Sequence, residues 1–557
     1  NLIISFGDKS YSSIPRLHKG GHSFMTNNKK YFYITTPIYY ASGTLHIGHA
    51  YSNCIADSIA RYERMTGKEV RFLTGSDEHG QKIEEKAKAL NETPQQFVDD
   101  TVKGFKETWK LLDITYDDFI RTTDERHVKV VKKVFTQLLN QGDIYLGQYS
   151  GWYCTPCESF FTQTQLIQPG NLCPSCKRPC HQETEEAYFL NCKKYTNQLL
   201  QFYKDHPEFS TENRINEMIN TFIKPGLDDL CITRTSFNWG IPTNENPKHV
   251  IYVWIDALLN YVSALGYLSE NDTLFKEYWG PDSEIVQLLG ADITRFHLIY
   301  WPILLFALKL RCPDRMLAHG LLLTHGGIKL SKSFHNAVEP KVLVDRYGLD
   351  AFRWYMVRGV KFGEQGQFTP TLFVNLTNTD LANGYGNLVN RTINMIKKYD
   401  DCVVPSYTDP ILDFTKKLYS DVAVYIKQYN DAWDNFDVTA ASGAAMSIVN
   451  AANKYVDDAA PWNLSKEGKT AEIDEVMHAL TYCIRVASIT LKPFLVTKAN
   501  MALDELNVPE DQRQLNTIND YKTFGNIKTN DPVPLFPRLK KDEEIKWLED
   551  LFAPKEK

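Results

Sequence analysis

The stretch between residues 31 and 80 constrains the fold most strongly, because its hydrophobic periodicity changes twice. Residues 31–40 are rich in aromatic and β-branched side chains, as a strand inside a sheet is. A helix that ends at Gly67 is predicted from apolar residues at helical spacing, namely Tyr51, Ile55, Ile59 and Tyr62. A second strand begins at Glu69, so the stretch is a βαβ unit with parallel strands and a ligand site beyond their carboxyl ends.

The tetrapeptide His46-Ile47-Gly48-His49 falls at that end of the first strand, where the helix begins. A helix start offers unpaired backbone N–H groups, which bind phosphate, and Gly48 lets a ligand approach the backbone closely. Two imidazoles three positions apart lie on one helical face and can donate hydrogen bonds to phosphate oxygens. The alternative is a pair of helix histidines with purely structural partners.

A second motif, Lys329-Leu330-Ser331-Lys332-Ser333, lies far downstream. A lysine-rich loop by itself is usually a solvated face. The combination of His46-Ile47-Gly48-His49 with this loop, however, resembles the class I aminoacyl-tRNA synthetases. The resemblance implies that both elements clamp ATP, that Lys332 stabilises the transition state at the α-phosphate, and that Lys329 belongs to the same catalytic set.

The length and composition limit the function classes. A chain of 557 residues forms more than one domain, and hydrophobic and aromatic contents of 43% and 12% indicate packed cores. A net charge of −6 gives no sign of a DNA-binding protein, although a local basic face is enough for RNA. The longest apolar run, residues 299–310, contains Pro302 and Lys309 and is shorter than the ~20 residues of a membrane span.

Two CxxC pairs, Cys154 with Cys157 and Cys173 with Cys176, predict one structural zinc ion. Four thiolates fill a tetrahedral site, so no position is left open for catalysis. The alternatives are disulfides or loose reduced thiols, and Cys180 is a further candidate ligand.

The rest of the chain completes an α/β doubly wound, Rossmann-like catalytic domain. Helices over residues 81–90, 93–112 and 123–141 are expected to cover the sheet, and new strands are predicted over residues 250–257 and 284–289. Residues 31–149 and 241–325 are therefore interpreted as two halves of one domain, with residues 150–240 as an inserted zinc-knuckle subdomain.

An all-α helical bundle is expected next, because strand signals nearly vanish after Asp380. We assign residues 326–378 to the KLSKS loop and a stem-contact region, 379–525 to the helical domain, and 526–557 to an extended strap and a last helix. Asn387, Arg391 and Trp462 are candidates for reading RNA bases by hydrogen bonds and stacking. The alternative is an ordinary solvent-facing side of the bundle.

From Tyr31 to about Leu539 the chain resembles the methionyl-tRNA synthetase family. The resemblance is carried by TTPIYYASGTLHIGHAY, TGSDEHG, the CxxC knuckles, KPGLDDL, SFNWGIP, HVIYVWIDALLNY, GADITRFHLIYWP, KLSKS, LANGYGNLVNR and APWNLSK. It implies a methionine pocket formed by Ile38, Tyr40, Asp77, Trp254, Ala257, Leu258, Tyr261, Ile293 and His297, with Asp77 on the substrate ammonium. It implies an ATP site formed by His46, Gly48, His49, Gly290, Asp292 and Lys332, with Mg²⁺ accompanying ATP.

The implied reaction is activation of L-methionine by ATP and transfer of the methionyl group to tRNA(Met), with Asn387, Arg391 and Trp462 at the anticodon. The alternatives are another HxGH adenylyltransferase without RNA, a non-catalytic tRNA-binding relative, and a zinc-ribbon nucleic-acid module. One departure from the family pattern is Phe334-His335-Asn336 after the KLSKS loop, where the family has a glycine in place of His335.

Residues 1–30 are expected to form a disordered N-terminal extension. Residues 1–24 are interpreted as leftover upstream sequence, with an organellar transit-peptide remnant as the alternative. The odd total of 11 cysteines, without a regular framework, indicates a reducing compartment. We expect a cytoplasmic monomer that binds ATP, methionine and tRNA(Met), but neither DNA nor a membrane.

Overall fold

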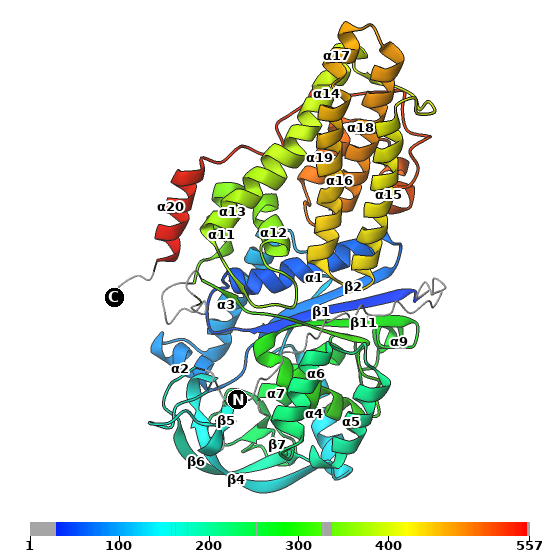
Figure 1. Cartoon of the computed structure of the whole chain (residues 1–557). Coiled ribbons are helices and arrows are strands. Elements are labelled where there is room, and N and C mark those ends of the chain that lie inside the picture. Colours follow the sequence, from blue (N-terminus) through cyan, green and yellow to red (C-terminus); the bar gives the residue numbers. More distant parts are fainter. Residues whose placement is uncertain are drawn as a thin grey trace, which may run out of the picture.

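The computed structural model describes residues 29–157, 159–161, 163–174, 176–251, 253–324, 327 and 337–553. Residues 1–28 of the predicted extension (residues 1–30) and the predicted KLSKS motif, residues 329–333, lie outside the described residues. Figure 1 shows a central sheet with an inserted β-rich region on one side and a tall helical bundle on the other.

A five-stranded parallel sheet, in the order β12-β11-β1-β2-β3, forms the centre. Its strands are β1 (Tyr31–Tyr40), β2 (Glu69–Asp77), β3 (Asp118–Arg121), β11 (Ser283–Gly290) and β12 (Arg315–His319). From β1 the chain proceeds outward through β2 and β3, and the later strands fill the other side. The strand order therefore reverses between β1 and β11, which is where open α/β sheets bind ligands.

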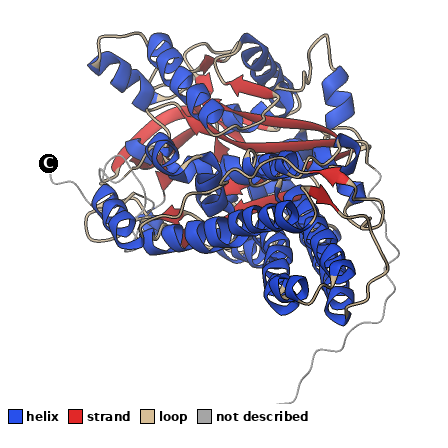
Figure 2. Cartoon of the chain, turned by 90° about the horizontal axis from the view of Figure 1, so that it is seen from above, coloured by secondary structure: helices blue, strands red, loops and turns tan. Residues whose placement is uncertain are grey.

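Helices cover both faces of this sheet (Figure 2). Alternate residues of β1 belong to different cores: Phe32 and Ile34 pack with the helices on one face, and Tyr33 packs with those on the other. The first face carries α1 (Ile47–Met65) and α3 (Pro94–Leu111), and the second carries α4 (Glu125–Asn140), α8 (Asn260–Ser263) and α10 (Trp301–Ala307). The predicted doubly wound domain is confirmed.

Two shorter helices of this domain are α2 (Gln81–Ala89) and α9 (Thr273–Tyr278).

The strand predicted over residues 250–257 is wrong. Only β10 (Val250–Ile251) is extended, and it pairs with β8 (Thr233–Arg234) and β9 (Ile241–Pro242) in a separate antiparallel sheet. The chain then forms helix α7 (Val253–Leu258). A short apolar run rich in β-branched and aromatic residues fits a strand or a buried helix equally well, and tertiary packing chose the helix here.

The inserted region is built on a four-stranded antiparallel sheet in the order β5-β4-β6-β7. Its long strands β4 (Ile144–Cys154) and β6 (His181–Leu190) pair along their length, flanked by β5 (Ser159–Phe161) and β7 (Leu230–Cys231). Two helices, α5 (Thr196–Asp205) and α6 (Glu212–Met218), lead back towards the central sheet.

The remaining chain is helical, as predicted. Gly348, at a φ of 85°, separates two helices, α11 (Pro340–Tyr347) and α12 (Leu349–Arg358). The helices that follow are α13 (Pro370–Leu376), a π-helix (Thr377–Gly386), α14 (Asn387–Tyr399), α15 (Asp413–Trp433), α16 (Val438–Ala459), α17 (Pro461–Lys466), α18 (Thr470–Leu491), α19 (Lys498–Glu505) and α20 (Lys541–Phe552).

Two short strand pairs complete the described part, β13 (Leu322–Leu323) with β14 (Gly366–Gln367), and β15 (Val403–Val404) with β16 (Ile527–Lys528). Within the described ranges no helix has the length and apolarity needed to cross a bilayer.

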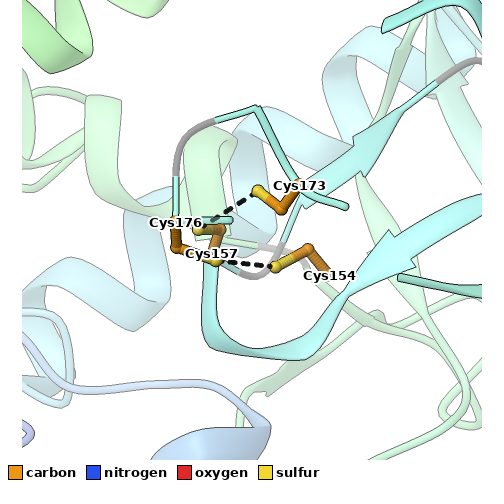
Figure 3. A group of neighbouring side chains, drawn as sticks. All are labelled: Cys154, Cys157, Cys173 and Cys176. Carbon is orange, nitrogen blue, oxygen red and sulfur yellow. Dashed lines mark hydrogen bonds between the residues drawn. The ribbon is translucent and has the colours of Figure 1, made fainter. Parts of the chain in front are cut away.

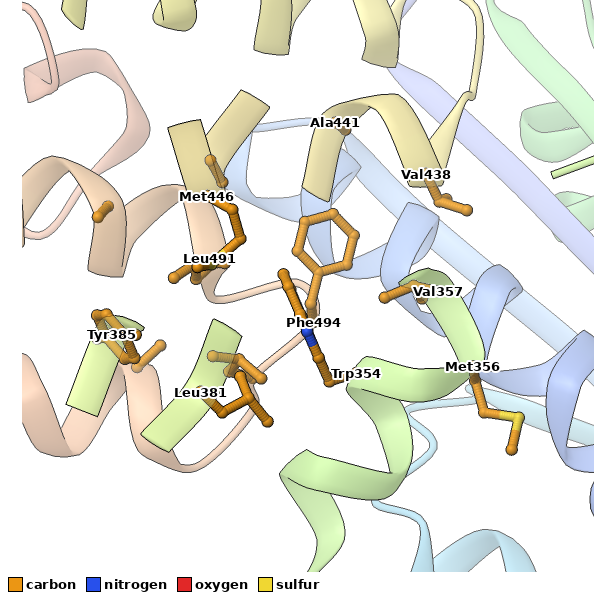
Figure 4. Close-up of a cluster of buried hydrophobic side chains, with 14 of the residues drawn as sticks. Trp354, Met356, Val357, Leu381, Tyr385, Val438, Ala441, Met446, Leu491 and Phe494 are labelled. Carbon is orange, nitrogen blue, oxygen red and sulfur yellow. The ribbon is translucent and has the colours of Figure 1, made fainter. Parts of the chain in front are cut away.

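One continuous hydrophobic core joins the sheet to the bundle. Figure 4 shows side chains from α12, the π-helix, α16 and α18 around Phe494. The Trp433 ring lies between those of Phe494 and Tyr62, stacked on each at centroid distances of 5.6 and 4.2 Å. Because Tyr62 lies on α1, the helix that begins at His46-Ile47-Gly48-His49 packs directly against the bundle.

Candidate active site and metal centre

The two motif histidines form the N-terminal cap of α1. His46 Nδ1 accepts a hydrogen bond from the Gly48 N–H at 3.1 Å, and His49 Nδ1 accepts one from the His46 N–H at 3.0 Å. Because each Nδ1 is an acceptor, the neutral rings carry their proton on Nε2 and can donate it to a phosphate oxygen. His46 is the N-cap residue and His49 lies three positions further on, and their ring centroids are 3.9 Å apart, so the two imidazoles lie on the same side of the helix start, as predicted.

The segment that follows the KLSKS loop returns to this helix start, where the Ile47 N–H donates to the carbonyl of Val338 at 3.0 Å. Val338 therefore lies beside the helix start that carries His46 and His49, whereas Lys329 and Lys332 lie outside the described residues.

Asp77 is the last residue of β2, and side-chain hydrogen bonds fix the next two residues, Glu78 and His79. Arg121 binds the Glu78 carboxylate with two hydrogen bonds of 2.7 and 2.8 Å, and Thr123 donates to it at 2.6 Å. His79 Nδ1 lies 2.7 Å from Asp256 Oδ2. These contacts fix the turn after β2 and leave the Asp77 carboxylate on the wall of an adjacent cavity.

That cavity, of about 210 Å³, brings together every residue predicted for the methionine pocket. They are Ile38, Tyr40, Asp77, Trp254, Ala257, Leu258, Tyr261, Ile293 and His297. The volume lies below the ~300–1,000 Å³ typical of sites for drug-sized ligands. The cavity therefore suits a small ligand with an apolar side chain and a cationic group.

Hydrogen bonds hold His297 and Tyr261 in the cavity lining as uncharged groups. His297 Nδ1 donates to the Ile293 carbonyl at 3.0 Å, so Nε2 accepts from the Tyr261 hydroxyl at 2.7 Å. Burial lowers the pKa of His297 to about 4, so the ring stays uncharged at neutral pH. Trp254 stacks on Phe296 at 3.4 Å. An uncharged aromatic wall of this kind suits a polarisable thioether.

The predicted ribose side lies at the end of β11. A Cβ on Gly290 would meet Asp292 Oδ1 at 2.7 Å, so a larger residue here would displace the Asp292 side chain. Asp292 lines a larger groove of about 1100 Å³ between the sheet edge and the inserted region. Trp254 lines both the groove and the smaller cavity, so the two spaces adjoin there.

The two cysteine pairs converge into one cluster, shown in Figure 3. The four sulfurs all lie within 4.8 Å of one another, with Cys154 Sγ 3.4 Å from Cys176 Sγ and Cys173 Sγ 3.7 Å from Cys157 Sγ. Sulfurs about 2.3 Å from a tetrahedral metal lie about 3.8 Å apart, so the set fits zinc. All 11 cysteines are free thiols, which excludes the disulfide alternative, and Cys180 is not part of the cluster.

Of the RNA candidates, Trp462 lies on α17, at the tip of the bundle (Figure 1), and Asn387 and Arg391 lie on α14. The Arg391 guanidinium lies 5.5 Å from the Trp462 ring centroid and pairs with Asp457 at 3.0 Å. Asn387 is exposed one helical turn earlier on α14, and Trp462 is 39% exposed. A half-exposed indole next to a guanidinium is able to stack on a base.

Some site residues were missed from the sequence. Asn260 lines the small cavity, and its Nδ2 donates to the Ala257 carbonyl at 2.6 Å, whereas its Oδ1 accepts no hydrogen bond from the described residues. Pro156 and Cys157 also line the cavity. Asn260 immediately precedes Tyr261 in HVIYVWIDALLNY, so its place in that motif was the signal. The sequence pattern did not predict that the cysteine cluster lies beside this cavity.

Comparison with known proteins agrees with this geometry. The family model for class I tRNA synthetases (M) matches residues 32–185 and 175–393, and the anticodon-binding domain of methionyl-tRNA ligase matches residues 405–556. The methionine–tRNA ligase of Halalkalibacterium halodurans is 48% identical over 96% of this chain and 82% of its own length. That of Bacillus subtilis is 46% identical over 94% of this chain and 80% of its own length.

Among solved structures, the methionyl-tRNA synthetase of Mycobacterium tuberculosis in complex with methionyl-adenylate superposes with a TM-score of 0.86. It is 35% identical, over 91% of this chain and 100% of that one. The fold, the family models and these relatives agree along nearly the whole described chain, and the chain therefore belongs to the methionine–tRNA ligase family of class I aminoacyl-tRNA synthetases.

Proposed function

We propose that this chain activates L-methionine with ATP to give methionyl-adenylate and then transfers the methionyl group to tRNA(Met). The observation that carries the proposal is the cavity of about 210 Å³, where a carboxylate, Asp77, faces an apolar and aromatic wall at the sheet edge that also holds His46 and His49. The methionyl-adenylate bound to the similar Mycobacterium tuberculosis enzyme supports the same ligand here.

In this proposal the methionine carboxylate attacks the α-phosphorus of ATP and pyrophosphate leaves. No protein nucleophile is needed, because the attacking oxygen belongs to the substrate. The protein positions the reactants and stabilises charge on the phosphoryl oxygens. His46 Nε2 and His49 Nε2 donate to these oxygens, Lys332 and Lys329 supply positive charge from the opposite side, and Asp77 binds the substrate ammonium.

Gly48, Gly290 and Asp292 complete the ATP side, with Mg²⁺ expected on the triphosphate. A 3′-terminal ribose hydroxyl of tRNA then attacks the carbonyl carbon of the adenylate, and AMP leaves. Asn387, Arg391 and Trp462 bind the anticodon; Trp462 lies within the match to the anticodon-binding domain, and the Arg391 guanidinium lies 5.5 Å from its ring centroid, which supports this role.

Cys154, Cys157, Cys173 and Cys176 would hold one zinc ion, which would supply structural cross-linking and no chemistry in the reaction. We also propose a cytoplasmic monomer. The free thiols support a reducing compartment, and light scattering after gel filtration tests the oligomeric state.

Amino-acid-dependent ATP–pyrophosphate exchange, measured with each of the twenty amino acids, tests the activity. Exchange with methionine, followed by charging of a tRNA(Met) transcript, is the expected result. Exchange without any charging would indicate an adenylyltransferase that does not use tRNA, and tRNA binding without exchange would indicate a non-catalytic relative.

A further inference from the structure

A buried chain of polar side chains lies behind the small cavity. Asp256 Oδ2 lies 2.7 Å from His79 Nδ1, and Asp256 Oδ1 lies 2.8 Å from His127 Nε2. His127 Nδ1 in turn lies 2.7 Å from Ser263 Oγ. Asp256 and His127 are fully buried, and His79 is only 6% exposed.

These residues come from four separate elements. His79 follows β2, His127 lies on α4, Asp256 on α7 and Ser263 on α8. Asp256 binds both imidazoles. Among these four side chains it therefore links the end of β2 to α4. None of these four side chains lines the cavity, so the chain does not touch the proposed substrate.

The cavity wall nevertheless depends on α7. Trp254, Ala257 and Leu258 line the cavity from this helix. At 100° per residue Asp256 points away from them, which places its carboxylate on the back of the wall. Asp77, the proposed partner of the ammonium, stands two positions before His79 and lines the same cavity.

We propose that Asp256 is a positioning residue: through His79 and His127 it fixes the separation between Asp77 and the aromatic wall on α7, and thereby the length of side chain that the cavity accepts. This inference rests on the proposed activation of methionine. Leaving a buried carboxylate without its hydrogen-bond donors would cost free energy. Both hydrogen bonds are therefore kept, and the distance between Asp77 and α7 stays fixed. Burial works to raise the pKa of Asp256, but the two imidazoles outweigh it and lower the pKa, so the carboxylate is ionised at neutral pH.

The test compares Asp256→Asn and Asp256→Ala with a matched control, Asp143→Asn. Asp143 is also a buried carboxylate, 2% exposed, and binds Lys194 and Tyr195 at the base of the inserted region, away from the cavity. The readouts are the Kd of L-methionine by calorimetry without ATP, the KM of ATP, and the kcat/KM ratio for methionine against ethionine, which is one methylene longer.

Asp256→Asn keeps one acceptor and turns the other into a donor, so it should weaken methionine binding about ten-fold. Asp256→Ala, which removes both acceptors, should weaken it further. Both variants should lower the preference for methionine over ethionine, with the KM of ATP unchanged. Asp143→Asn should leave all three quantities at the wild-type values.

Methionine affinity and selectivity that stay at the wild-type level in folded Asp256→Asn would overturn the proposal, as would equal losses for methionine and ATP. If Asp256→Ala does not fold, His127→Gln gives the same comparison, because it removes one imidazole and keeps the carboxylate. A wild-type chain without methionine-dependent exchange would instead contradict the proposed function, so the two failures are distinguishable.

Discussion

The guanidinium of Arg353 donates a hydrogen bond of 2.7 Å to the carboxylate of Asp57, and neither residue is more than 1% exposed. Asp57 lies on α1, the helix capped by His46, and Arg353 lies on α12. Arg353 also donates to the carbonyls of Leu112 and Pro493 at 3.0 and 3.3 Å. One side chain therefore ties the catalytic sheet to the helical bundle.

Replacing Arg353 by Ala should lower the free energy of unfolding by about 3–5 kcal/mol, because it leaves the Asp57 carboxylate buried with only part of its partners. Arg126→Ala is the control, since Arg126 pairs with Asp118 at 2.8 Å while 44% of its side chain is exposed. An exposed pair contributes about 0–1 kcal/mol. Denaturant unfolding of both variants measures the difference, and equal losses would show that Arg353 does not carry the interface.

Lys332→Ala should reduce ATP–pyrophosphate exchange by about two orders of magnitude or more, because the variant loses a positive charge that stabilises the transition state. The Kd of methionine should barely change, since Lys332 is assigned to the phosphates. Calorimetry and exchange kinetics measure the two quantities, with Lys341→Ala, an exposed lysine paired with Asp345, as the control. ATP–pyrophosphate exchange at the wild-type rate would show that Lys332 does not stabilise the transition state.

Trp462→Ala should weaken charging of tRNA(Met) about ten-fold or more, because one stacked base is worth ~1–3 kcal/mol. Adenylate formation should stay near the wild-type rate, since Trp462 belongs to α17, which lies at the tip of the bundle (Figure 1). Val424→Ala, on an exposed face of α15, is the matched surface control. A parallel loss in both assays would contradict an anticodon role for Trp462.

Loss of the metal should raise the KM of methionine about ten-fold, because Cys157 belongs to the cluster and lines the methionine cavity together with Pro156. Cys176→Ser tests this without altering a cavity residue, and Cys180→Ser is the control outside the cluster. Elemental analysis reports the metal content and exchange kinetics the KM. A metal-free Cys176→Ser variant with an unchanged KM of methionine would show that the metal centre does not affect methionine binding.

Stability should depend on pH through Glu505, which is 6% exposed and whose pKa burial raises from 4.5 to about 7. The folded state holds this proton more tightly than the unfolded state, so the contribution to stability is complete below pH 4.5 and is lost as the pH rises through about 7. Glu505→Gln should therefore raise Tm by about 2 °C or more at pH 8, and by less at pH 5.5.

Thermal unfolding at the two pH values measures this difference. Glu107→Gln, which removes an exposed carboxyl, should show no such dependence. A Tm difference between Glu505→Gln and the wild type that is the same at both pH values would show that Glu505 does not titrate between them.

The sequence by itself determined the βαβ unit, the two cysteine pairs and the residues that line the small cavity, because each rests on local spacing or on a motif. Periodicity located the helix that became α1, although packing buries nearly every side of α1 and α18. It was insufficient for residues 250–258, where strand and helix bury the same side chains and only the packing of α7 against the sheet decides.

The tertiary structure alone decided which distant groups meet. Asp57 and Arg353 are 296 positions apart, and Asp256 lies 177 positions from His79. Such contacts leave no trace in spacing, because they depend on how whole elements pack and not on the residues between them. The cap formed by His46 and His49, the cysteine knuckle beside the cavity and the Arg391–Trp462 contact became visible only in the folded chain for the same reason.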